Sequence, residues 1–219
     1  MAREDRSHLT AVTRRGPSLP TRNAAKFLNL KGMRVLDFGQ GRGADVKWLR
    51  ARGSRAAGFD PFYQPRKPRG RFDLVLCNYV VNVLRPEPRW RLVQEAFKAV
   101  RPGGWILFSA RRDTEVKKEA TRGQWAPEDD GYRTTHGTFQ CGLHPVELGA
   151  LVRLSLEESF PAVLVDFVVD VSTPAYSAVL CHRPAWLTDR AAFHGVADGV
   201  GRYGRDGLRA RGSAPPARR

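Results

Sequence analysis

Cysteine is scarce in this chain of 219 residues, which holds only Cys77, Cys141 and Cys181. The three lie far apart and are odd in number, so the pattern argues against a disulfide framework and against a CxxC metal site. Long apolar runs are also missing, since no stretch approaches the ~18–20 residues that a membrane span needs. The first ten residues, MAREDRSHLT, contain no apolar core of a signal peptide. We therefore expect a cytoplasmic protein with no membrane span and no metal site.

Acidic residues are few compared with basic ones. Asp and Glu number 22 against 37 Lys and Arg, which gives a net charge of +15. The excess lies in the N-terminal half and the tail: residues 1–34 carry eight basic and two acidic residues, residues 35–110 carry 14 and six, and residues 185–219 carry seven and three. A polyanionic partner, nucleic acid before membrane, is the functional interpretation of this excess. The alternative is a compositional preference for Arg without selection for binding.

Hydrophobic residues make up 42% of the chain, which is enough for the core of one globular domain. We divide the chain into a basic N-terminal arm with a short helix (1–32), a central domain (33–184) and a basic tail (185–219). The tail is rich in Gly, Arg and Pro and is predicted to be disordered. Within the domain, the polar stretch 111–143 is predicted to be a long loop, and loops of that length are usually functional.

Strand and helix patterns alternate along the central domain. Short apolar runs predict strands at 35–38, 56–60, 72–77, 105–110, 163–171 and 177–181, and helical spacing predicts helices at 20–29, 44–52, 90–100 and 145–156. Pro102-Gly103-Gly104 is expected to separate the third helix from the strand after it. The alternation indicates an α/β fold with a mostly parallel sheet. The last two strands are joined by only Ser172–Tyr176, too short a connection for a parallel crossover, so they are expected to form an antiparallel hairpin.

A glycine-rich turn follows the first predicted strand. In Val35-Leu36-Asp37-Phe38-Gly39-Gln40-Gly41-Arg42-Gly43, the glycines permit a tight turn and let a ligand approach the backbone. The helix that follows directs free N–H groups toward whatever is bound there. Asp60 ends the next strand, 23 residues after Asp37, where a carboxylate can accept ribose hydroxyls. The pattern indicates a nucleotide site, and Gly39-x-Gly41-x-x-Ala44 alone also matches the turn of dinucleotide-binding dehydrogenases.

The spacing Asp37-x-Gly39-x-Gly41-x-Gly43 resembles motif I of the class I S-adenosylmethionine-dependent methyltransferases. Three further stretches resemble that family's other motifs: Gly58-Phe59-Asp60-Pro61, the FDLVLCNYV run at 72–80, and RPGGW at 101–105. The resemblance covers roughly residues 33–182 and implies a Rossmann-like class I methyltransferase fold, including the antiparallel end hairpin. It also implies S-adenosylmethionine as the cofactor, held by residues Asp37, Gly39, Gly41, Gly43, Asp60, Pro61, Phe62 and Asn78.

A narrower resemblance comes from residues 10–18, TAVTRRGPS, together with FGQGRGAD, FDPFYQP and LCNYVVNVL. These segments look like phage-type and DNA-phosphorothioation-associated methyltransferases, which usually carry Cys where this chain has Gln40. One departure concerns the 11 residues Pro61–Arg71, where the family usually has a helix and another strand. Three prolines and no strand pattern predict that this edge strand is missing, which leaves the backbone or the rings of Phe62 and Tyr63 to hold the adenine.

The methyl acceptor is not identified by any motif. Asn78-Tyr79-Val80-Val81 occupies the place where nucleic-acid amino-methyltransferases carry an Asp/Asn-Pro-Pro-aromatic motif, but it contains no proline. We therefore carry three hypotheses: a nucleic-acid methyltransferase, a small-molecule or protein methyltransferase, and a non-catalytic nucleic-acid-binding protein on the same scaffold. Tyr79, Asp113 and His136 are weak candidates for a catalytic role. A base is needed only if the acceptor arrives protonated.

Overall fold

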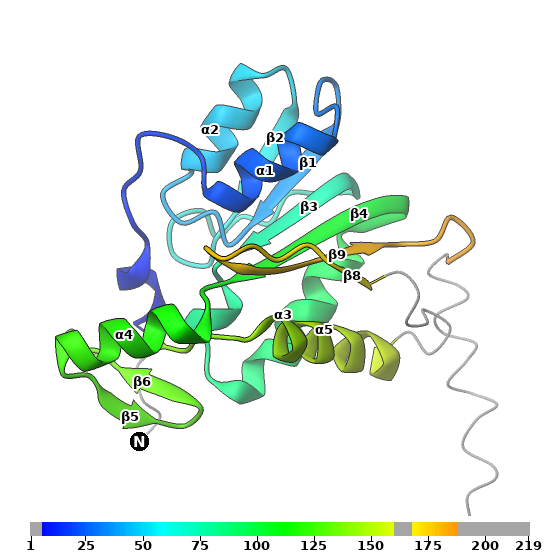
Figure 1. Ribbon diagram of the computed structural model, residues 1–219. Coiled ribbons are helices and arrows are strands. Elements are labelled where there is room, and N and C mark those ends of the chain that lie inside the picture. The colour runs from blue at the N-terminus through cyan, green and yellow to red at the C-terminus, as the bar shows by residue number, and fades with distance from the viewer. Residues whose placement is uncertain (1–5, 160–167, 188–219) are drawn as a thin grey trace, which may run out of the picture.

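A six-stranded sheet forms the centre of the protein, in a computed structural model that describes residues 6–159 and 168–187 (Figure 1). The strands lie in the order β2-β1-β3-β4-β9-β8. Their bounds are β1 Arg34–Phe38, β2 Arg55–Phe59, β3 Phe72–Asn78, β4 Val100–Ala110, β8 Val168–Asp170 and β9 Ser177–His182. The pairs β1–β2, β1–β3 and β3–β4 are parallel, whereas β9 pairs with both β4 and β8 in antiparallel register. The predicted α/β fold with an antiparallel end hairpin is confirmed. The beginning of the predicted strand 163–171 lies outside the described residues.

Helices cover both faces of the sheet. The α-helices are α1 Leu19–Phe27, α2 Ala44–Ala51, α3 Pro86–Lys98, α4 Asp113–Gly123 and α5 Pro145–Ser159, with short 3₁₀ turns η1 Ser7–Thr10 and η2 Val81–Val83. Figure 1 shows α1 and α2 on one face and α3 and α5 on the other. No helix in the two described ranges, 6–159 and 168–187, has the length and apolar character to cross a membrane.

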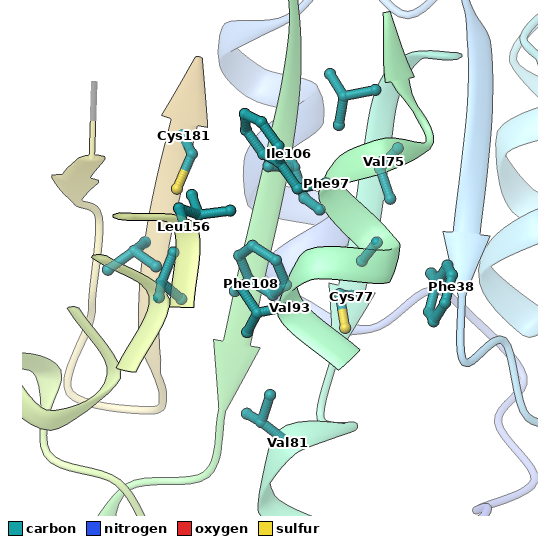
Figure 2. Close-up of a cluster of buried hydrophobic side chains, with 14 of the residues drawn as sticks. Phe38, Val75, Cys77, Val81, Val93, Phe97, Ile106, Phe108, Leu156 and Cys181 are labelled. Carbon is teal, nitrogen blue, oxygen red and sulfur yellow. The ribbon is translucent and has the colours of Figure 1, made fainter. Parts of the chain in front are cut away.

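Side chains of the strands alternate between two cores, as the two-residue period of a strand requires. Val35, Leu74 and Leu76 point to the α1–α2 side. Val75, Cys77 and Phe108 point to the α3–α5 side, where Phe97 of α3 is fully buried (Figure 2). Removing a buried aromatic ring such as that of Phe97 typically costs about 3–5 kcal/mol of stability.

The sheet ends at β2, as the proline-rich segment Pro61–Arg71 predicts. No strand of the described chain lies outside β2, and residues 60–71 contribute only an isolated bridge between Asp60 and Gln64. The prediction that Pro102-Gly103-Gly104 lies before the strand is wrong. These residues lie within β4, where the pairing with β3 shifts register between Phe72 and Leu74 and Gly103 adopts a φ of 74°.

The prediction of a loop over residues 111–143 is also wrong. The segment contains α4 and a separate three-stranded sheet of β5 Ala126–Glu128, β6 Gly131–Arg133 and β7 Phe139–Gln140. We call α4 with this sheet the cap (residues 113–140). An ion pair fixes the cap to α3, because the guanidinium of Arg89 binds both carboxylate oxygens of Asp130, one of them at 2.9 Å. Arg89 is buried at 4% exposure, whereas the side chain of Asp130 is 44% exposed.

Candidate functional site

A cavity of about 1060 Å³ lies where the parallel strands end. Its wall comes from the glycine turn after β1, the residues after β2 and β3, the N-terminal segment 7–14, helix α4 and Gln140 of β7. In an open α/β sheet, the carboxyl ends of the strands are where ligands bind, because the loops leave the backbone accessible there. The cavity therefore brings the predicted nucleotide motifs and the cap into one site.

The glycine turn has a conformation that side chains would oppose. Gly39, Gly41 and Gly43 have φ values of 87°, 53° and 76°, in the left-handed region that favours glycine. A Cβ atom on Gly39 would lie 2.3 Å from Cγ2 of Val80, and one on Gly41 would lie 3.2 Å from Cβ of Ala11. Gly39 and Gly41 line the cavity as predicted, whereas Gly43 is not at its wall and instead precedes the first residue of α2.

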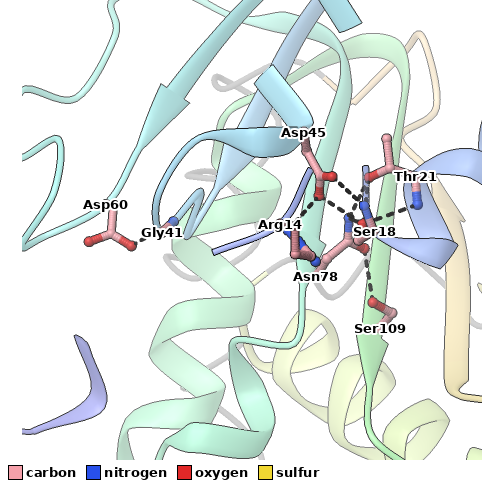
Figure 3. Close-up of polar contacts among 8 residues, drawn as sticks. All are labelled: Arg14, Ser18, Thr21, Gly41, Asp45, Asp60, Asn78 and Ser109. Carbon is pink, nitrogen blue, oxygen red and sulfur yellow. Dashed lines mark hydrogen bonds and ion pairs between the residues drawn. The ribbon is translucent and has the colours of Figure 1, made fainter. Parts of the chain in front are cut away.

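Asp60 lines the cavity and holds the turns around it. Its Oδ2 accepts a hydrogen bond of 3.0 Å from the N–H of Gly41 (Figure 3), and its Oδ1 accepts from the N–H groups of Phe62 at 2.9 Å and Tyr63 at 3.0 Å. A carboxylate offers about four acceptor sites, so at least one remains after these three bonds. Pro61 and Phe62 also line the cavity, and the ring of Phe62 stacks on His8 with centroids 4.0 Å apart.

Asp37 is buried behind the glycine turn and is not at the cavity wall. It is 2% exposed, and its Oδ2 has no hydrogen-bond partner. Burial raises the pKa of Asp37 well above its ordinary value of 3.8, the neighbouring Asp45 adds to the rise, and Arg14 partly offsets it. A buried acceptor without a partner is costly, so this atom is a place where a ligand donor would be favourable.

A buried polar network holds the residues that follow the N-terminal segment, Ser18 and Thr21, against Asp45 and Asn78 (Figure 3). The side chain of Asp45 accepts hydrogen bonds from the backbone N–H and the hydroxyl of Ser18, the latter at 2.7 Å. The amide of Asn78 donates to Thr21 Oγ1 at 2.9 Å, and its Oδ1 accepts from Ser109 at 2.9 Å. Asn78 lines the cavity as predicted, but its side chain is committed to this network.

The N-terminal segment's part in the site was not evident from the sequence. Residues 7–14, predicted as part of a separate arm, line the cavity instead, and they include His8, Ala11 and Arg14. The segment is held by two more contacts: Tyr63 donates its hydroxyl to the carbonyl of His8 at 3.1 Å, and Arg42 Nε donates to the carbonyl of Ala11 at 3.2 Å. These contacts join residues far apart in the chain, so no local sequence pattern could predict them.

Beyond the glycine turn, the wall has an apolar part and a charged part. Apolar side chains follow β3 and continue into α3: Val80, Val83, Leu84, Pro88 and Leu92. Charged side chains of α3, of the residue pair before α4 and of α4 itself also line the cavity: Arg91, Glu95, Arg111, Glu115 and Glu119. Arg111 is paired within its own segment, with Nη2 lying 2.9 Å from Glu119.

The three catalytic candidates lie in different places. Tyr79 lines the cavity and has a φ of 60°, a strained conformation for a residue with a side chain. Burial raises the pKa of Tyr79 to about 12, so its hydroxyl stays protonated at neutral pH. Asp113 and His136 are not at the cavity wall: Asp113 begins α4 and borders a separate hollow of about 270 Å³, and His136 is exposed between β6 and β7.

The three cysteines are buried and free, and burial raises the pKa of each thiol. They are therefore poor candidates for a nucleophile. Among the residues that the structure describes, no group of three His, Cys, Asp or Glu side chains could hold a metal ion.

Comparison with known proteins gives a family for this arrangement. Residues 9–142 match the sequence profile of the family described as "Methyltransferase domain". No curated protein matches the chain in a sequence search.

Solved structures share the fold at low sequence identity. A 1,6-didemethyltoxoflavin-N1-methyltransferase of Burkholderia thailandensis, solved with S-adenosylhomocysteine, is 19% identical, with a TM-score of 0.51 over 76% of this chain and 79% of its own. Human N-acetylserotonin methyltransferase, solved with S-adenosylmethionine, is 16% identical, with a TM-score of 0.51 over 76% of this chain and 52% of its own. The present chain thus spans about half the length of the human enzyme's chain.

Proposed function

The chain belongs to the methyltransferase-domain family, and we propose that it transfers a methyl group from S-adenosylmethionine to a small molecule bound in the same cavity. The observation that carries the proposal is the single cavity at the strand ends, which joins the glycine turn and Asp60 to an apolar wall under the cap. Its volume of about 1060 Å³ is slightly above the ~300–1,000 Å³ typical of small-ligand sites. That is room for a nucleoside cofactor and a second small ligand side by side.

The residues present fit the cofactor. Asp60 faces the cavity with acceptor capacity left after its three backbone bonds, which suits ribose hydroxyls. Gly39 and Gly41 keep side chains away from the surface that the ligand would contact. Asp37 lies behind the turn, from where its negative charge would favour the ammonium group, and Pro61 and Phe62 line the cavity where the adenine would lie.

S-Adenosylmethionine supplies a methyl group on a sulfonium, which leaves readily. The protein's task is then to align the acceptor and to exclude water. Residues of the N-terminal segment and of α4 line the cavity, and so do the apolar residues Val80, Val83 and Leu84. The protonated hydroxyl of Tyr79 can donate a hydrogen bond to the acceptor, but it does not serve as a base at neutral pH.

A second candidate acceptor is nucleic acid, which the net charge of +15 favours. The finer resemblance to phage-type and DNA-phosphorothioation-associated methyltransferases points the same way. Against it stands the lack of prolines after Asn78, where nucleic-acid amino-methyltransferases carry their Asp/Asn-Pro-Pro-aromatic motif. We therefore place the small molecule first.

Methyl transfer from labelled S-adenosylmethionine distinguishes the two. The full-length protein is incubated with donor and, separately, a small-molecule cell extract, total DNA and total RNA, with Asp60→Ala as the matched inactive variant. The proposal predicts label in the small-molecule fraction that depends on Asp60. Label that appears only in DNA or RNA would give the second candidate first place.

A further inference from the structure

Basic residues gather at the end of the main sheet that lies away from the cavity. Strands β1–β4 are parallel and end at the cavity, so all four begin at the opposite end of the sheet. The segments that lead into these strands, which we call the basic end, hold nine basic residues and one acidic residue: 31–34, 50–55, 69–73 and 98–101. The described residues of the cavity wall, in contrast, include five Lys or Arg and four Asp or Glu. The charge excess is therefore concentrated away from the cavity.

An arginine stands at the beginning of each of these four strands. Arg34 is the first residue of β1, and Arg55, its partner in the register, is the first residue of β2. Arg71 directly precedes β3, and Arg101 is the second residue of β4. The strand order β2-β1-β3-β4 places the four arginines in one row. Because neighbouring strands lie about 4.8 Å apart, the row is about 14 Å long.

Two guanidinium groups of the row are held by backbone carbonyls. Arg34 Nη2 donates to the carbonyl of Arg69 at 3.3 Å, and Arg55 Nε donates to the carbonyl of Gly32 at 3.0 Å. A carbonyl fixes the side chain but does not cancel its charge. Both side chains belong to exposed residues, and an arginine has five N–H donors, so each keeps donors for a further acceptor.

The basic end has little negative charge of its own. Its one carboxylate, that of Asp73, accepts hydrogen bonds from Nε of Arg101 and, at 2.7 Å, from the backbone N–H of Arg34. Lys98 has a carboxylate partner on its own helix. Within residues 6–159 and 168–187, the guanidinium groups of Arg34 and Arg55 form no ion pair with a carboxylate. The positive charge at the start of β1 and β2 is therefore available to an anionic partner.

A row of arginines is complementary to a regular row of phosphates. The planar guanidinium matches two oxygens of one phosphate group. One strand of a nucleic-acid duplex presents a charge about every 3.4 Å along the axis, so about four phosphates fit beside a row of about 14 Å. We propose that the basic end is a docking surface for the phosphate backbone of a duplex nucleic acid. The duplex bound there is a partner of the protein and not its methyl acceptor, because the surface lies at the end of the sheet away from the cavity.

The test measures the binding of a labelled DNA duplex by fluorescence anisotropy over a salt series. Arg34→Gln/Arg55→Gln removes two charges from the basic end, and the control Lys118→Gln/Arg122→Gln removes two exposed charges from α4, outside the cavity wall. The basic-end variant should bind about 10- to 100-fold more weakly at ~50 mM salt, and its slope of log K against log salt should flatten by about 1.8, since each phosphate contact contributes about 0.9. The control should bind as the wild type does. The affinity should not depend on the DNA sequence, because phosphate contacts do not read bases.

Two further variants separate lost charge from damaged structure. Arg34→Lys/Arg55→Lys keeps both charges but not the guanidinium forks, and it should retain most of the affinity. Arg52→Gln/Arg69→Gln removes two other charges of the basic end and should weaken the duplex in the same direction. Thermal unfolding shows which variants are folded, and if Arg34→Gln/Arg55→Gln is not, Arg52→Gln/Arg69→Gln takes its place.

Four outcomes would overturn the proposal. Equal losses in the basic-end variant and the α4 control would show that binding follows net charge alone, and a Lys variant as weak as the Gln variant would show that charge is not the cause. A wild-type protein that does not bind the duplex is the third. The fourth comes from vesicles of phosphatidylcholine and phosphatidylserine: a basic-end variant that loses these vesicles but keeps DNA would identify a membrane surface. None of these measurements involves methyl transfer, so their result is independent of the proposed function.

Discussion

Two carboxylates close to the glycine turn are buried with opposite consequences. Asp45 accepts three hydrogen bonds, two from Ser18 and one from Arg14, whereas Oδ2 of Asp37 accepts none. A buried charge is stabilising only when it is paired and hydrogen-bonded. Asp37 therefore costs folding free energy that Asp45 does not.

Asp37→Asn should stabilise the protein while it weakens the cofactor. The pKa of Asp37 is raised in the folded state, so the folded protein holds a proton that the unfolded chain releases, and stability falls as the pH rises above about 3.8. Asp37→Asn has no ionisable group at this position, so its stability does not fall with pH for this reason. We expect its free energy of unfolding to exceed that of the wild type by about 1–3 kcal/mol at pH 8, with the difference shrinking toward pH 4.

Urea unfolding at a series of pH values measures this difference. Asp45→Asn is the matched control, and it should destabilise the protein because it removes an acceptor that three donors use. If Asp37→Asn lowers stability at pH 8, the carboxylate has a partner in the folded protein and our account of its cost is wrong.

At the scale of elements, the ion pair between Asp130 and the buried Arg89 is one of the contacts that join the cap to α3. Asp130→Asn weakens the pair with Arg89 and leaves that buried guanidinium without its counter-charge. Because Asp130 is 44% exposed, we expect a modest loss of about 1–2 kcal/mol, smaller than for a fully buried pair. Cofactor affinity should change less than about threefold, since the pair lies away from the glycine turn, while turnover of the acceptor falls.

Thermal unfolding, cofactor titration and turnover are measured on the same samples, with Asp129→Asn as control. Asp129 pairs with Arg85, which has Glu128 as a second partner, so its loss should be smaller. An Asp130→Asn variant that loses cofactor binding along with turnover would make the cap part of the donor site.

The strands of the main sheet could be predicted because their apolar runs are short, dense and bounded by Gly, Pro or Asp. The cap could not be predicted in this way, because α4 buries only Val116 and Ala120 and its three strands have two or three residues each. The charge pattern could have indicated α4, because the acidic residues in its first turn and Arg122 in its last turn complement the helix dipole.

The same division holds within the site. That Gly39, Gly41 and Asp60 line one cavity could be predicted, because one strand-turn-helix unit and the end of the next strand place them together. The place of the N-terminal segment at the cavity was missed because it depends on the pairing of Ser18 with Asp45, 27 positions apart. Asp37 and Gly43 belong to the glycine-turn motif but do not line the cavity. A sequence motif gives the positions of residues along the chain, but it does not show which of them face the cavity.

At the scale of the whole molecule, the charge of +15 remains outside the proposed chemistry. We expect weak binding to duplex DNA at ~50 mM salt that decays with a slope of about −0.9 per phosphate contact. It should neither displace S-adenosylhomocysteine nor raise turnover. Fluorescence anisotropy over a salt series, with and without the cofactor product, checks this. DNA that stimulates turnover would instead make the charge part of substrate recognition.

Titration of the protein with S-adenosylhomocysteine in a calorimeter tests the central claim most directly, namely that the cavity at the strand ends holds this cofactor through the glycine turn and Asp60. The account predicts a Kd in the micromolar range, about −8 kcal/mol. Asp60→Ala should weaken it by about 1–3 kcal/mol, the cost of losing charge-assisted hydrogen bonds. Binding of NAD with no binding of S-adenosylhomocysteine would contradict the account.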